Sequence, residues 1–259
     1  MRIALAVEYD GSPFCGWQYQ DHSPSVQETV EKALSKVANH FVRVTCAGRT
    51  DTGVHATEQI IHFDTEAVRE DHQWVFGANA NLPDSISILW ARRVSDAFHA
   101  RFSAIRRRYR YAILNRRIRP ALLAHRVVWE YRPLDVARML EAATYLIGEH
   151  DFSSYRALAC QAKSPVRTLY QLDVKRQGEL ISLDLEANAF LHHMVRNIAG
   201  VLMTIGAGEQ APGWAKEVLE RRDRTLGGVT APAGGLYLTG VEYPDEFELP
   251  RLSRLPTVW

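Results

Sequence analysis

The stretch RRYRYAIL, residues 107–114, decides how the chain is divided. Its two tyrosines and its isoleucine alternate with other residues, as in a β-strand that buries one face. One complete run of predicted strands and helices precedes this stretch, and a second run follows it. A chain of 259 residues is expected to form one large or two small domains. We therefore predict two successive α+β halves that divide near residues 101–106.

Hydrophobic spacing predicts the elements of each half. The first half is predicted to contain strands over 2–9, 42–46, 58–63 and 87–94, a helix capped by Ser25 and Glu28, and a helix over 69–80. The second half is predicted to contain strands over 107–114, 166–175, 180–187 and 236–243, and helices over 134–147, 189–205 and 213–222. The predicted domains are residues 1–104 and 105–243, followed by an irregular tail, 244–259.

Composition excludes some classes of protein but does not indicate which reaction the protein catalyses. The chain has 31 Lys and Arg against 30 Asp and Glu, a net charge of +1, so total charge does not indicate a nucleic-acid partner. The three cysteines are far apart and form no CxxC pair, which argues against a disulfide framework or a cysteine zinc site. The apolar run at the N-terminus is too short for a signal peptide, and no apolar run is long enough to span a membrane. We expect a soluble, cytoplasmic protein with no membrane partner.

A basic stretch lies at the junction of the two halves. No acidic residue occurs between Ala97 and Trp129, whereas arginines are frequent there. In a strand, Arg106, Arg108 and Arg110 would share one face and Tyr109 the other. One guanidinium group can bind a phosphate through two hydrogen bonds, and aromatic rings stack on unpaired bases. The stretch, which also includes Arg101, favours an RNA-contacting surface over an ordinary solvated face.

The segment CAGRTDTGVHA, residues 46–56, is the most unusual in the chain. It places Asp51 between Arg49 and His55, with a glycine on each side of the turn. Glycines allow close approach of a ligand, and a nearby cation favours the ionised carboxylate that nucleophilic catalysis needs. The structural alternative is an aspartate that caps its own turn, which is common.

Two further interpretations attach to the same turn. The tripeptide Asp51-Thr52-Gly53 also occurs in aspartic proteases, which need two such loops, and this chain would have to dimerise to supply the second. Alternatively Cys46, His55 and His62 could bind a metal, but they lack the spacing of a ligand pair on one helix. Both interpretations are weaker than that of a catalytic or structural turn, and we predict no metal.

The segment FLHHMVRNIAGVLMTIG, residues 190–206, reads as an amphipathic helix. One side is apolar, and His192, His193, Arg196 and Gly200 fall on the opposite side. A glycine in mid-helix is less favourable than alanine by about 1 kcal/mol. One turn beyond Arg196, it would let another chain or a nucleotide come close. The alternative is an exposed arginine beside a glycine that serves packing.

Taken together, CAGRTDTGVHA, RRYRYAIL and FLHHMVRNIAGVLMTIG, in this order and with YDGSPFCGWQ near the start, resemble the tRNA pseudouridine synthase A family. The resemblance extends over essentially the whole chain. The family usually has alanine or serine where this chain has Thr52. The resemblance implies two ferredoxin-like halves, a mainly antiparallel mixed sheet with flanking helices, and a central catalytic cleft.

The resemblance also implies an activity and its participants. These are isomerisation of uridine to pseudouridine in the anticodon stem-loop of tRNA, at tRNA nucleotides 38, 39 and 40, by a homodimer without cofactor or metal. Asp51 matches the catalytic aspartate, Tyr109 the tyrosine that stacks on the target base, and Arg196 the basic residue that pairs with the aspartate. Arg49 matches an arginine of the catalytic loop that assists base flipping. The phosphates of the stem are assigned to Arg101, Arg106, Arg108 and Arg110. A non-catalytic RNA-binding module is the main alternative.

Overall fold

The computed structural model describes residues 1–250, apart from the side chain of Leu226, and the chain divides into two compact units. The first unit consists of Met1–Arg106 together with the chain from Tyr237 onward, and the second of Arg107–Leu236. The closing strand differs from the prediction, because it pairs with a strand of the first unit and belongs there.

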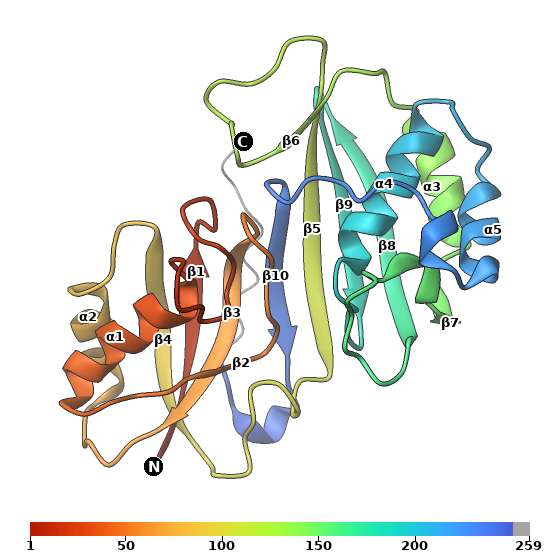
Figure 1. Ribbon diagram of the computed structural model, residues 1–259. Coiled ribbons are helices and arrows are strands. Elements are labelled where there is room, and N and C mark those ends of the chain that lie inside the picture. Colours follow the sequence, from red (N-terminus) through yellow and green to blue (C-terminus); the bar gives the residue numbers. More distant parts are fainter. Residues whose placement is uncertain (251–259) are drawn as a thin grey trace. The chain divides into compact units, whose positions relative to one another are not determined.

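The first unit is a sheet in the order β4-β1-β3-β10, with β2 added to β3 (Figure 1). All of these pairs are antiparallel except β3 with β10. Helices α1 and α2 pack against each other, and α2 packs against β4. The elements are β1 (Arg2–Tyr9), α1 (Val26–Ala38), β2 (Thr45–Cys46), β3 (His55–Asp64), α2 (Asp71–Asn79), β4 (Ile86–Val94) and β10 (Leu236–Glu242).

The second unit has an antiparallel sheet in the order β5-β9-β8-β7, to which β6 adds in parallel beside β5. Helix α3 packs on β8 and on α4, and α5 contacts α3 (Figure 1). The elements are β5 (Arg106–Asn115), β6 (Val128–Glu130), α3 (Val136–Thr144), β7 (Gly148–Asp151), β8 (Val166–Gln177), β9 (Leu180–Ala187), α4 (Met194–Gly206) and α5 (Trp214–Arg221). The prediction of an α+β protein with a mainly antiparallel sheet is confirmed.

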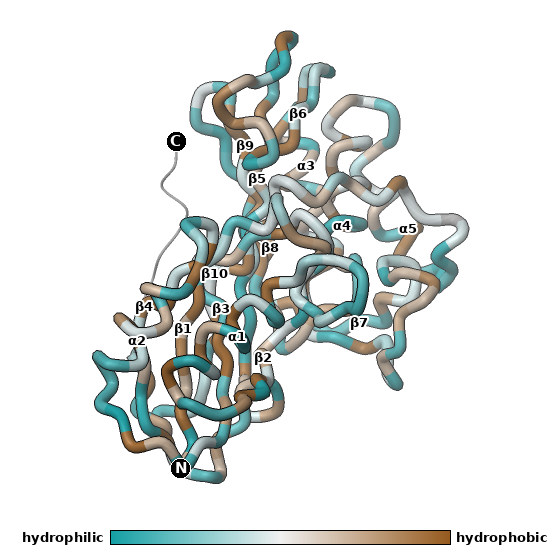
Figure 2. Tube along the Cα trace, turned by 60° about the vertical axis from the view of Figure 1, so that its left-hand side comes forward, coloured by the Kyte–Doolittle hydropathy of each residue, from teal (hydrophilic) through white to brown (hydrophobic). Residues whose placement is uncertain are grey.

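Strand β1 differs from the half-buried strand that its sequence predicts. Five consecutive residues from Ile3 to Val7 are buried, and Figure 2 shows the strand as a hydrophobic segment. The reason is its position between β3 and β4, with cover on both faces. Small side chains, Ala4 and Ala6, occupy one face, where they pack in a cluster with Phe98.

Helix boundaries follow local capping where a cap exists. Ser25 caps α1 as predicted, because its Oγ accepts a hydrogen bond from the Glu28 N–H at 3.2 Å. The Glu28 carboxylate forms an ion pair with Lys32, 2.6 Å away. The predicted helix 189–205 is wrong at its start: α4 begins at Met194, because His193 takes a left-handed conformation with φ of 61°. Three short elements differ from the prediction: β6 and β7 were not predicted, and β2 covers only part of 42–46.

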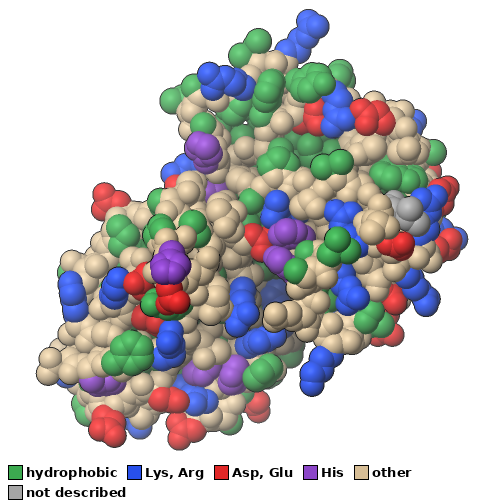
Figure 3. All heavy atoms as spheres, in the orientation of Figure 1, with side chains coloured by type: hydrophobic (Ala, Val, Ile, Leu, Met, Phe, Trp, Pro, Cys, Tyr) green, Lys and Arg blue, Asp and Glu red, His purple; other side chains and the backbone are tan. Residues whose placement is uncertain are grey.

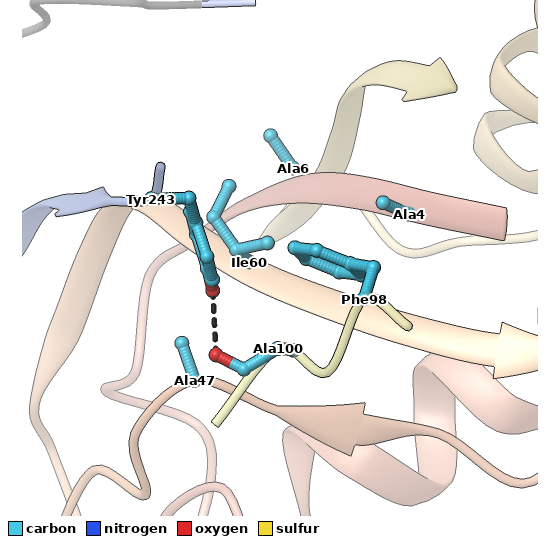
Figure 4. Close-up of a cluster of buried hydrophobic side chains, with 7 residues drawn as sticks. All are labelled: Ala4, Ala6, Ala47, Ile60, Phe98, Ala100 and Tyr243. Carbon is cyan, nitrogen blue, oxygen red and sulfur yellow. Dashed lines mark hydrogen bonds between the residues drawn. The ribbon is translucent and has the colours of Figure 1, made fainter. Parts of the chain in front are cut away.

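A buried cluster in the first unit joins segments that are distant in sequence. Ala4, Ala6 and Ile60 from the sheet meet Ala47, Phe98, Ala100 and Tyr243 there (Figure 4). The Tyr243 hydroxyl donates to the Ala100 carbonyl at 2.6 Å. Part of the predicted irregular tail packs against this cluster through Phe247 and Leu249, and residues 251–259 lie outside the described residues. Ala47 begins the Asp51 turn, so the cluster holds the base of that turn.

Among residues 1–250, no helix combines the length and the apolar character needed to cross a bilayer.

Replacing Tyr243 with phenylalanine is expected to lower the free energy of unfolding by about 1–2 kcal/mol, because the Ala100 carbonyl loses a buried donor. Chemical denaturation measures the change. Tyr145→Phe is the matched control, since this tyrosine is 36% exposed at the end of α3. An equal loss in both variants would show that the hydrogen bond does not stabilise the cluster.

Candidate active site

The Asp51 turn is held at its base by side chains of the first unit. The Gln59 amide accepts from the Gly48 N–H at 3.3 Å and donates to the Gly48 carbonyl at 2.5 Å. The Thr50 hydroxyl bonds to the Tyr9 hydroxyl at 2.8 Å, and the Thr50 carbonyl accepts from the Trp17 N–H at 3.0 Å. These bonds surround the residue before Asp51, so the carboxylate projects from an anchored backbone.

The turn itself is tight. The Val54 N–H donates to the Asp51 carbonyl at 3.1 Å, and Gly53 has φ of 75°, a conformation that favours glycine. Asp51 is half-buried, while Arg49 and Thr52 are exposed. Thr52 is therefore accommodated at the surface of the turn, where its extra methyl group meets no buried neighbour.

A second loop, residues 10–17, lies against the turn at backbone distance. A Cβ placed on Gly11 would come 2.0 Å from the Val54 carbonyl oxygen, and one on Gly16 would come 2.8 Å from the Thr50 oxygen. Only glycine permits this approach. Gly11 also donates its N–H to the Nδ1 atom of buried His55 at 3.1 Å. The sequence analysis assigned no role to YDGSPFCGWQ. Its two glycines are the feature that indicates close packing against the Asp51 turn.

The candidate metal ligands Cys46, His55 and His62 have structural roles. The His55 ring stacks on Tyr237 at 4.7 Å, and His62 Nδ1 accepts from the Ala100 N–H at 3.1 Å. Burial raises the pKa of the Cys46 thiol to about 12, against the opposing charges of Arg49 and Arg101. The two histidines therefore serve as packing and hydrogen-bonding groups in the first unit.

In the second unit, Tyr109 and Arg196 lie toward the same face of the sheet. Tyr109 is 9% exposed and meets the Phe190 ring edge to face at 4.9 Å. Burial raises the pKa of Tyr111, two residues along the same face, and the nearby charge of Arg196 opposes that shift. Phe190 is a neighbour that the sequence did not single out for Tyr109.

Arg196 is tied to the segment 229–232 of its own unit. Its Nε donates to the Ala231 carbonyl at 2.8 Å, and the Ala231 N–H donates to the Arg196 carbonyl at 3.1 Å. A Cβ on Gly200 would lie 1.9 Å from the Val229 oxygen. The close approach predicted at Gly200 is therefore made by this segment, not by a nucleotide or another chain. The predicted polar side of α4 is correspondingly covered rather than open.

Arg106, Arg108 and Arg110 of β5 lie on the face away from Tyr109, as predicted, and Arg108 and Arg110 have acidic partners. Arg108 Nε is 2.6 Å from Glu186, and Arg110 makes two bonds to Asp184, at 2.6 and 2.9 Å. These acids lie directly opposite on β9. Any phosphate that binds Arg108 or Arg110 therefore competes with a carboxylate already in place. Figure 3 shows acidic side chains among basic ones on the visible face of the protein.

Arg101 and Arg106 occupy other positions in the first unit. Arg101 is exposed in the turn after β4, and its guanidinium lies 5.5 Å from the centre of the Phe102 ring. Arg106 is half-buried at the first position of β5. Within the first unit, Arg49 and Arg101 both approach Cys46 closely enough to affect its thiol. The Asp51 turn and the Arg101 turn are therefore neighbours.

The first unit thus supplies a carboxylate on an anchored backbone, and the second unit supplies a buried tyrosine and an arginine held by its own unit. A family model described as tRNA pseudouridine synthase matches residues 5–103 and 142–244. The chain therefore belongs to the tRNA pseudouridine synthase family, and it is an isomerase that acts on tRNA. The strand with Tyr109 lies between the two matched segments.

Relatives with the name tRNA pseudouridine synthase A align over nearly the whole chain. The protein of Nitrosococcus oceani is 63% identical over 100% of both chains. That of Pseudomonas aeruginosa is 61% identical over 99% of this chain and 93% of its own. That of Coxiella burnetii (strain Dugway 5J108-111) is 59% identical over 98% of both. The resemblance inferred from the motifs is confirmed.

Replacing Gly11 with alanine is expected to slow pseudouridine formation by about 10- to 100-fold, because the new Cβ displaces the Val54 carbonyl and with it the Asp51 turn. Single-turnover assays on a tRNA transcript measure the rate. Gly213→Ala is the control, since a Cβ there meets nothing within 4 Å. A folded Gly11→Ala variant with an unchanged rate would contradict this account of the turn.

Replacing Arg110 with glutamine is expected to lower the free energy of unfolding by about 1–3 kcal/mol, because Asp184 loses a paired, half-buried partner. Arg101→Gln is expected to lower the slope of log affinity against log salt by about 1, through the loss of one phosphate contact. Denaturation and salt-dependent tRNA binding measure the two effects. The reverse pattern would place Arg110, not Arg101, at the RNA surface.

Proposed function

We propose that the protein converts uridine to pseudouridine at nucleotides 38, 39 and 40 of the tRNA anticodon stem-loop, with Asp51 as the nucleophile. The observation that carries the proposal is the anchored Asp51 turn. Its backbone is held by Gln59 and Trp17, and its carboxylate projects half-buried from the tip. The homologous proteins carry the name of this activity, but the nucleotide positions and the role of Asp51 rest on the resemblance.

The reaction needs no external electron source. The N1–C1′ bond breaks, the uracil turns, C5 bonds to C1′, and the proton leaving C5 is balanced by one gained at N1. An ionised carboxylate can add to C6 of the uracil or attack C1′, and either addition is reversed before the product leaves. Deprotonation of C2′ toward a glycal is the alternative in which Asp51 acts as a base. We favour the nucleophilic role because the Asp51 turn resembles the catalytic loop of the family.

The other residues take roles that follow from base flipping. A uridine leaves the stack at a cost of a few kcal/mol, which is smallest in loops and at stem ends. Tyr109 would restore the lost stacking, Arg49 would fill the vacated space, and Arg196 would pair with the Asp51 carboxylate. This proposal requires the two units to present these groups to one uridine. Phosphates of the stem would bind Arg101, Arg106, Arg108 and Arg110, and at Arg108 and Arg110 a phosphate would compete with the acidic partner.

Two further parts of the proposal concern the state of the protein in the cell. We infer that it acts as a homodimer in the cytoplasm, where tRNA is available. The inference rests on the resemblance to the family and on the absence of a membrane-crossing helix among residues 1–250.

Asp51→Asn is expected to abolish pseudouridine formation while leaving tRNA affinity within about twofold, since the amide keeps the shape but not the charge. Purified protein is incubated with an unmodified tRNA transcript without added metal, and the nucleosides are analysed. Transcripts with cytidine in place of uridine at position 38, 39 or 40 locate the product. Pseudouridine elsewhere would overturn the positions, and an active Asp51→Asn variant would overturn the role of the aspartate.

The non-catalytic alternative gives a different result in the same assay. An RNA-binding module would bind the transcript and form no pseudouridine with either the native protein or the variant.

A further inference from the structure

A short turn after β4 presents an aromatic ring to solvent. Phe102 is 75% exposed. The ring of His99 stacks on it at 4.3 Å with an angle of 30° between the planes, and the Arg101 guanidinium lies 5.5 Å from its centre. Single exposed hydrophobic residues are common on protein surfaces and need no function. This one differs because a second ring and a cation accompany it.

The turn is rigid at each of its residues. The His99 Nδ1 atom accepts the N–H groups of Arg101 and Phe102, each at 3.2 Å. The His99 carbonyl accepts from Ser103 at 2.9 Å, and Ser103 Oγ accepts from the His99 N–H at 3.0 Å. Burial, with the nearby charge of Arg2, lowers the pKa of His99, so its ring is neutral near pH 7. The Phe102 ring is thus presented with little conformational freedom left to lose on binding.

Buried contacts place this turn beside the base of the Asp51 turn. Ala100 is fully buried in the cluster that also contains Ala47 (Figure 4). The Ala100 N–H is held by His62, and its carbonyl by Tyr243. Ala47 directly precedes Gly48 and Arg49 of the Asp51 turn. A tRNA that reaches Asp51 therefore passes close to Phe102 and Arg101.

We propose that Phe102, with Arg101 beside it, is a stacking site for an unpaired base of the tRNA substrate other than the target uridine. Aromatic rings bind single-stranded bases by stacking, with added cation–π attraction from arginine. In an RNA stem-loop only unpaired nucleotides can turn a base face toward such a ring. The site would hold the loop in register while a different uridine reaches Asp51. This inference rests on the proposed function, since it assumes a tRNA substrate.

The test measures binding of a tRNA transcript that has no uridine at nucleotides 38–40, so that turnover does not affect the result. Phe102→Ala is expected to raise the Kd about 5- to 150-fold, the value of one base–aromatic stack. Phe102→Trp is expected to restore binding, because it keeps a stacking surface. Phe76→Ala is the matched control: Phe76 is 71% exposed on α2 of the same unit and is expected to leave the Kd unchanged.

Three further measurements distinguish stacking from other effects. The slope of log Kd against log salt is expected to stay the same in Phe102→Ala, because no charge is lost. An uninterrupted RNA duplex is expected to bind Phe102→Ala and the native protein equally, because it offers no unpaired base. Thermal unfolding is expected to be unchanged, because the ring is exposed.

Three outcomes would overturn the stacking site: an unchanged Kd in Phe102→Ala, an equal loss in Phe76→Ala, or an equal loss on duplex RNA. A change in sedimentation with unchanged tRNA binding would assign the ring to a protein contact and would also overturn it. Failure of the proposed function is a separate result, namely no pseudouridine formed by the native protein on an unmodified transcript. If the native protein is active and Phe102→Ala binds normally, only the stacking site fails.

Discussion

The functional turn depends on one contact between two backbones, the approach of Gly11 to the Val54 carbonyl. Any side chain at Gly11 would place its Cβ 2.0 Å from that oxygen, and Gly16 makes a similar approach to the Thr50 carbonyl. The two glycines let the loop 10–17 lie directly against the Asp51 turn and exclude solvent from one side of it. Without them, the Trp17 N–H could not reach the Thr50 carbonyl, and the Gly11 N–H could not reach the ring of His55.

In the second unit, a glycine on a helix permits a close backbone approach in the same way. Gly200 lets the segment 229–232 lie against α4, and this segment then accepts a bond from the Arg196 guanidinium. In both units, therefore, the residue expected to act on the substrate is oriented by a second piece of chain that a missing Cβ admits. Arg108 and Arg110 are oriented differently, by acidic partners across the sheet. In the first unit, Arg2 and Arg43 are likewise paired with acidic side chains.

Much of the fold was predictable because its elements carry local signals. Hydrophobic spacing located every strand of more than four residues and each α-helix, and the Ser25 cap located the start of α1. The errors occurred where tertiary contacts outweigh spacing. Strand β1 is buried on both faces, α4 begins after a left-handed His193, and β6 and β7 form only because longer strands lie beside them. For the site, the motifs led to the proposal of Asp51, Arg49, Tyr109 and Arg196 but did not point to Gln59 or Phe190, because the role of an amide or a ring depends on which groups lie beside it in the fold.

The amino-acid sequence by itself determined the order of elements, the place where the chain divides, and the family, since spacing and motifs are properties of neighbouring residues. Only the tertiary structure decided which side chains have partners. It assigned β10 to the first unit, paired Arg110 with Asp184, covered the face of Gly200 with residues 229–231, and set Phe102 beside His99. Each of these contacts forms in a packed interior or in a fixed turn. The strength of a contact depends on the distance between its two residues in the fold, and the local order of residues does not encode that distance.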